Sequence, residues 1–152
     1  MSTFTLIHVI ISLIGIASGL VVVYGFVVGH RFKSWNALLL VMTIATSVTG
    51  FFFPYHGRTP GIVLGIVSLI VLAIALLSLS KGWTKTYIIT CTLAEFFNVL
   101  VLIVQIFLKI SFAHMFAPKG TEPIVAICQG LAFCAFAILA VIAIRKKKFI
   151  LV

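Results

Sequence analysis

The chain has 152 residues, of which 63% are hydrophobic and only 9% are charged, and its mean hydropathy is +1.35. This composition excludes a water-soluble domain of this size and indicates a polytopic membrane protein. The formal net charge of +9 does not indicate nucleic acid, because the basic residues stand at the ends of apolar runs and not on a polar face interleaved with aromatic side chains. Membrane topology and attraction to anionic lipid headgroups explain them better.

Five apolar runs divide the chain, and we expect each to form a membrane-spanning helix in one all-α bundle. A helix rises about 1.5 Å per residue, so about 20 residues cross a hydrocarbon core of about 30 Å. The first run is too long for a signal peptide, no basic residue precedes it, and no small-x-small cleavage site closes it. The predicted spans are about 4–28, 35–53, 61–80, 87–112 and 124–144, in a single domain covering 1–152.

The first three runs carry small and polar residues at helical spacing. In lipid such faces let helices approach closely, and dispersion and hydrogen bonding replace the hydrophobic effect. We therefore expect them to pack inside the bundle. They are His8, Ser12, Gly15 and Gly19 in the first run, Thr43, Thr46, Ser47 and Gly50 in the second, and Gly61, Gly65 and Ser68 in the third.

The fourth run is interrupted by Glu95, Asn98, Gln105 and Lys109. Spacings of three, seven and four residues place them within one helical face of roughly 80°. Glu95 lies about 13 Å from the inner end of this run, where a charge facing lipid would cost at least several kcal/mol. The face is therefore predicted to look inward, and Thr43 of the second run lies at a similar depth. Lys109 is about 21 Å from Glu95 along the axis, too far to pair with it, and is expected to extend toward the membrane surface.

Two hypotheses remain open for Glu95. The first is a proton or cation relay through Glu95, Asn98 and Gln105, because an ionisable residue at this depth is a functional candidate. The second is a neutral glutamic acid that hydrogen-bonds to Thr43 or Ser47 and holds the bundle together, since burial favours the uncharged carboxyl.

The fifth run carries one amide, Gln129, about five residues inside its predicted outer end. Its depth is similar to that of Gln105. We expect these two amides to form a structural contact between helices.

A second group of candidate residues is predicted at the outer side of the membrane. Imidazole and carboxylate together are plausible ligands for zinc, copper or iron, although no HExxH or His-x3-His spacing fixes two ligands on one helix. A bis-histidine haem would require a second histidine to fold inward, because one histidine alone lies clearly inside a span. The candidate ligands for a transition metal or haem are His8, His56, His114 and Glu122.

Recognisable catalytic motifs are missing from the sequence. No hydrolase elbow, P-loop, dinucleotide fingerprint or zincin motif occurs, and Glu95 and Glu122 are too far apart to form a catalytic pair. Cys91, Cys128 and Cys134 lie within apolar runs without a CxxC spacing, so neither a disulfide framework nor a zinc site is predicted. The sequence favours a non-enzymatic role.

The basic residues divide unequally between the two sides of a five-span bundle. One side would carry eight of them and the other two, with Lys109 near the membrane edge. The positive-inside rule then predicts an outer N-terminus and a cytoplasmic C-terminus. The richer side has Arg31, Lys33, Lys81, Lys85, Arg145, Lys146, Lys147 and Lys148, and the poorer side has Arg58 and Lys119.

Four segments together resemble a group of small, uncharacterised bacterial inner-membrane proteins. The resemblance spans nearly the whole chain and implies a bacterial cytoplasmic membrane, without implying an activity or a site residue. The segments are SLIGIASG (12–19), TSVTGFFFP (46–54), FNVLVLIVQ (97–105) and APKGTEP (117–123).

Three functions follow from these patterns as hypotheses. The leading one is a small non-enzymatic integral membrane protein that acts as a homo-oligomer or as an accessory subunit of a membrane complex, because a single five-helix bundle would not cover all the small-residue faces. The alternatives are a proton-coupled transporter or channel using Glu95, and a haem- or metal-binding redox protein using the outer histidines.

Overall fold

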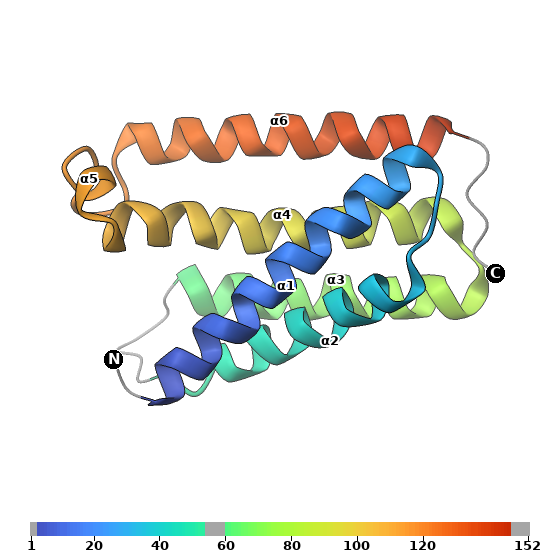
Figure 1. Ribbon diagram of the computed structural model, residues 1–152, viewed down its shortest axis with the longest axis horizontal. Helices are drawn as coiled ribbons and strands as arrows, with labels where there is room; N and C mark the ends of the chain where they lie inside the picture. The colour runs from blue at the N-terminus through green and yellow to red at the C-terminus, as the bar shows by residue number, and fades with distance from the viewer. Residues whose placement is uncertain (1–2, 54–59, 147–152) are drawn as a thin grey trace.

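The computed structural model describes residues 3–53 and 60–146, and within this part the chain forms six α-helices and no strand (Figure 1). The predicted all-helical fold is confirmed. The helices are α1 (Thr3–Val28), α2 (Lys33–Gly50), α3 (Pro60–Lys81), α4 (Thr84–Lys109), α5 (Ser111–His114) and α6 (Pro123–Arg145).

Four of the long helices, α1, α3, α4 and α6, are long and apolar enough to cross a membrane. The second predicted span corresponds to α2, which has 18 residues and is not among them. Its first turns contain Lys33 and Asn36, and hydroxyl-bearing residues recur along its second half. These polar groups lower its hydropathy, so membrane crossing by α2 remains a prediction.

The fourth predicted span ends earlier than expected. Helix α4 stops at Lys109, Ile110 adopts an extended conformation with φ −95° and ψ 117°, and α5 follows as a single turn. The ring Nδ1 of His114 lies 3.2 Å from the carbonyl oxygen of Phe107. This contact engages one of the last carbonyls of α4, which have no partner within the helix.

The long helices run back and forth, so their connections alternate between two ends of the bundle (Figure 1). Helix α1 crosses the bundle obliquely and packs against α2, α4 and α6, while α4 packs against α1, α3 and α6. Helix α6 lies at the edge, with three buried residues among its 23.

We call the end that holds the α1–α2 and α3–α4 turns and the end of α6 the basic end (Figure 1). The positions of these turns bring together six described basic residues from four helices and their connections, whereas the opposite end has two described lysines, Lys109 and Lys119. The six residues are Arg31, Lys33, Lys81, Lys85, Arg145 and Lys146.

Both turns at the basic end contain a glycine in the left-handed conformation, directly after the last residue of the preceding helix. Gly29 has φ +76° and Gly82 has φ +70°. After α1, the N–H of His30 donates to the Gly25 carbonyl over 2.8 Å, and after α3 the N–H of Trp83 donates to the Ser78 carbonyl over 2.9 Å. These bonds have the spacing of the Schellman motif, which satisfies terminal carbonyls and reverses the chain sharply.

The largest apolar cluster joins α1, α2, α3 and α4 in the half of the bundle near the basic end, and Ala143 near the end of α6 also belongs to it. It contains Phe26 of α1, Leu39 of α2, Leu72 of α3 and Cys91 of α4, all nearly inaccessible. A smaller cluster of Val23, Phe96 and Phe136 attaches α6 to α1 and α4. The core therefore holds α1 to α4 together, and α6 contributes one buried residue to each of the two clusters.

Replacing Gly29 by alanine should destabilise the protein by about 1–2 kcal/mol, because a Cβ is strained in the left-handed region. Apart from Gly29 and its two chain neighbours, no described residue lies within 4 Å of the position that this Cβ would occupy, so the effect would come from the backbone alone. Reversible unfolding in detergent measures the change. Gly29→Asn should cost less, since asparagine tolerates this conformation, and equal costs for the two variants would contradict the interpretation.

Candidate functional site

Glu95 is fully buried near the middle of α4 and is the one acidic side chain in the interior of the described part. Its carboxyl group lies against Gly19 of α1, and a Cβ built on Gly19 would collide with the carboxyl carbon and with Oε2. The absence of a side chain on Gly19 is therefore what makes room for the carboxyl. This close approach explains why a glycine stands on the face of α1 that meets α4.

One amide connects Glu95 to the second helix. Asn98 Nδ2 donates to Glu95 Oε2 over 3.3 Å and to Thr43 Oγ1 over 3.0 Å. Thr43 is buried on α2, and a Cβ on Gly15 of α1 would lie 3.7 Å from its Oγ1. We call Gly19, Thr43, Glu95 and Asn98 the Glu95 cluster, which joins α1, α2 and α4.

The second carboxyl oxygen, Glu95 Oε1, is buried and has no hydrogen-bond partner among the described residues. Buried polar atoms are nearly always hydrogen-bonded in proteins, and each exception requires an explanation. Glu95 thus has one oxygen that accepts from Asn98 and one enclosed oxygen with no donor in the described part of the chain.

Other residues of the predicted inward polar face lie outside this cluster. Ser47 donates to Ser68 Oγ over 3.4 Å and so connects α2 to α3. The predicted hydrogen bond from Glu95 to Thr43 or Ser47 is replaced by the one from Asn98. Gln105 is exposed and Gln129 is half-buried, with no hydrogen bond between them. Helix α1 crosses α4 obliquely, so its N-terminal half lies away from the C-terminal end of α4 (Figure 1).

The outer-side candidate ligands have separate local roles where they are described. His8 Nδ1 lies 2.8 Å from Thr49 Oγ1, and the ring of His8 meets that of Phe53 edge to face at 5.0 Å. His114 contacts a carbonyl of α4, as above, while His56 lies outside the described residues. Within residues 3–53 and 60–146, no group of three His, Cys, Asp or Glu side chains is placed to hold a metal ion.

Glu122 fastens the loop that precedes α6. Its Oε1 accepts the N–H of Lys119 over 2.9 Å, and its Oε2 accepts the N–H of Thr121 over 3.0 Å. The hydrogen bond from Lys119 is the main cause that holds the pKa of Glu122 below its ordinary value. Both carboxylate oxygens are therefore engaged by the chain itself.

A second buried polar contact, at the basic end, was not anticipated. Tyr87 Oη donates to Asn36 Oδ1 over 2.8 Å, and Asn36 Nδ2 donates to the Phe32 carbonyl over 2.9 Å. The guanidinium of Arg31 lies 5.8 Å from the centre of the Tyr87 ring, within the range of a cation–π contact. The available signal was an asparagine and a tyrosine, each at the start of an apolar run, on the same predicted side of the membrane.

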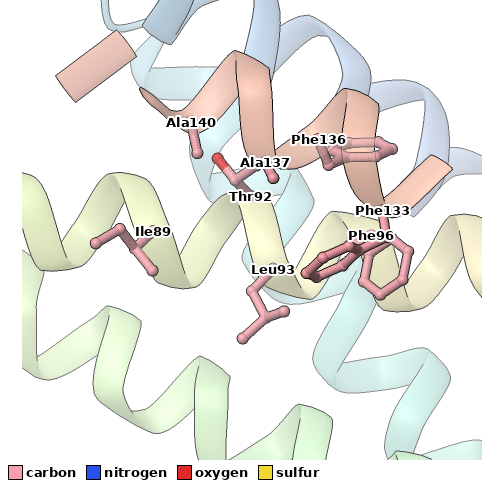
Figure 2. Close-up of a pocket in the computed structure, with 8 residues that line it drawn as sticks. All are labelled: Ile89, Thr92, Leu93, Phe96, Phe133, Phe136, Ala137 and Ala140. Atoms are coloured by element: carbon pink, nitrogen blue, oxygen red, sulfur yellow. The ribbon is translucent and has the colours of Figure 1, made fainter. Parts of the chain in front are cut away.

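An apolar groove of about 130 Å³ lies between α4 and α6, and Glu95 does not line it (Figure 2). Phe96 of α4 meets Phe133 and Phe136 of α6 with ring centres 5.6 and 6.2 Å apart. The remaining lining residues are Ile89, Thr92, Leu93, Ala137 and Ala140.

No protein-family profile, curated protein or solved structure matches this chain.

Gly19→Ala should destabilise the protein by about 1–3 kcal/mol, because the new methyl group displaces a carboxyl that is packed on all sides. In the double variant Gly19→Ala/Glu95→Ala, most of the cost attributable to the collision should disappear. The measurement is a double-mutant cycle of unfolding free energies in detergent.

Gly50→Ala is the control, since the nearest atom to its Cβ position is His8 Cε1 at 3.8 Å, an ordinary van der Waals distance. A Gly19→Ala variant as stable as this control, or strictly additive single changes, would show that Gly19 and Glu95 are not coupled.

Proposed function

We propose that the protein is a small, non-enzymatic integral membrane protein that crosses a bacterial cytoplasmic membrane five times and acts as a homo-oligomer or as an accessory subunit of a membrane complex. Four helices of sufficient length and apolar character support the membrane location. The basic end supports a cytoplasmic C-terminus, because cytoplasmic loops carry an excess of lysine and arginine. The same residues favour contact with anionic lipid headgroups.

The exposed surface of α6 is the observation that carries the assembly role. In the 18-residue apolar stretch that makes α6 a candidate span, 11% of the residues are buried, against 28–33% in the corresponding stretches of α1, α3 and α4. Small side chains recur on this exposed helix at positions 126, 130, 134 and 137, and we call them the α6 stripe. Small residues let two helices approach closely in lipid, so the stripe suits contact with a helix of another subunit.

The topology prediction is tested with reporters that are active in the cytoplasm only. Fusions after Lys33 and at Val152 should be active, whereas fusions after Arg58 and after Lys119 should be silent. An active fusion after Arg58 would show that α2 does not cross the membrane, and a silent fusion at Val152 would reverse the proposed orientation.

For the assembly prediction, Gly130→Leu should weaken self-association about tenfold or more, equivalent to about 1.4 kcal/mol. The added side chain would hold a second helix away from the α6 stripe. Native mass spectrometry over a series of detergent dilutions measures the change.

Ala135→Leu is the control, because residue 135 is exposed on α6 and lies about 140° around the helix from Gly130. Equal effects of the two substitutions would exclude the α6 stripe as the contact. A wild-type protein that is monomeric at every dilution would exclude the homo-oligomer and leave only the accessory-subunit role.

A further inference from the structure

The surroundings of Glu95 Oε1 favour one chemical form of this side chain over the other. An ionised carboxylate only accepts hydrogen bonds, whereas a carboxylic acid carries one O–H and needs fewer donors. Asn98 supplies a donor to Oε2, and Oε1 has none among the described residues. A buried carboxylate requires a cation or several donors, so this environment fits the neutral acid.

No described cation is close enough to Glu95 to stabilise its charge. On α4 itself, Lys85 and Lys109 are ten and fourteen residues away, about 15 and 21 Å along the axis. The charged residues of the helices packed around the cluster stand in end turns at the basic end. They are Lys33 of α2, Lys81 of α3 and Arg145 of α6.

The other titratable side chains of these helices also leave Glu95 without a charged partner. His8 is engaged with Thr49 near the far end of α1, and Tyr24 is exposed. Tyr87 donates to Asn36, and Cys91 is a buried thiol one turn before Glu95. On α6, Cys128 is half-buried and Cys134 is exposed.

We propose that Glu95 is an intramembrane proton-binding site, and that α1 closes over it through Gly19. In the closed form the proton is bonded to Oε1, and Asn98 holds Oε2. On release, the O–H bond breaks, its electron pair stays on Oε1, and the proton passes to water. The carboxylate then needs hydration, and water gains space beside it when α1 separates from α4 at Gly19.

Asn98 is a positioning residue in this proposal. Its Nδ2 also donates to Thr43 Oγ1, which orients the amide so that a nitrogen and not an oxygen faces the carboxyl. The site goes beyond the proposed assembly role and supplies the proton-binding step that a proton-coupled function of Glu95 would require.

Infrared spectroscopy of the protein in lipid vesicles tests proton binding directly. The chain has two acidic side chains, so Glu122→Gln leaves Glu95 as the sole side-chain carboxyl. Its carboxylic-acid C=O band should be present at neutral pH, shift in D2O and with ¹³C-labelled glutamate, and disappear reversibly when the pH is raised. Circular dichroism shows over which pH range the helices persist.

Two infrared results would overturn the proposal. Absence of an acid band at neutral pH would show a permanent carboxylate. A band that stays unchanged at every pH at which the helices persist would show a fixed structural acid. Glu95→Gln supplies the blank spectrum, and the isotope shift assigns the band without that variant if it fails to fold.

Cys91 reports whether α1 moves, because its buried thiol belongs to the same apolar cluster as Val22 and Phe26 of α1. Two proteins are compared, both with Cys128→Ser and Cys134→Ser, one with Glu95 and one with Glu95→Gln. At a pH above that at which the acid band is lost, N-ethylmaleimide should label Cys91 several-fold faster in the protein that has Glu95. Comparison at one pH removes the effect of thiol ionisation. Equal rates at every pH would overturn the closure by α1.

Discussion

Placing a carboxyl group in the middle of an apolar helix constrains the packing of the whole bundle. A charge in this position is costly in lipid, so the carboxyl must be enclosed by protein. Gly19 lets α1 approach Glu95 without a side chain between them, and Asn98 links the carboxyl to Thr43. Three helices meet at one polar point, and the oblique path of α1 is what allows it to meet both α2 and α4.

Apolar packing surrounds the Glu95 cluster, and the two apolar clusters of the described residues contain no charged side chain. The larger cluster lies toward the basic end and includes Ala143 of α6, and the aromatic contacts of Phe96 attach α6 farther along. Because lipid competes equally well for apolar side chains, close fit and hydrogen bonds must select the helix partners. The buried hydrogen bond from Tyr87 to Asn36 selects α2 as a partner of α4 near the basic end. The Glu95 cluster selects the partners of α4 in the middle of the bundle.

The two ends of the bundle differ in chemistry. Glycine-dependent turns reverse the chain at the basic end, where six described basic residues gather. At the opposite end, His8, His114 and Glu122 bond to nearby groups of the chain. Their local contacts stabilise helix ends and a loop. Glu95 is therefore the strongest candidate for a functional residue.

Periodicity and charge pattern by themselves determined the helical fold, the approximate helix bounds and the segregation of basic residues. They also identified Glu95 as a candidate functional residue, because all of these features depend on local spacing along the chain. Only the tertiary structure decided that Gly19 faces Glu95, that Asn98 bridges to Thr43, that Gln105 is exposed and that α6 lies at the edge. Those features depend on the angles at which helices cross. A crossing angle results from the packing of side chains from distant segments, so it cannot be predicted from the residue spacing within one helix.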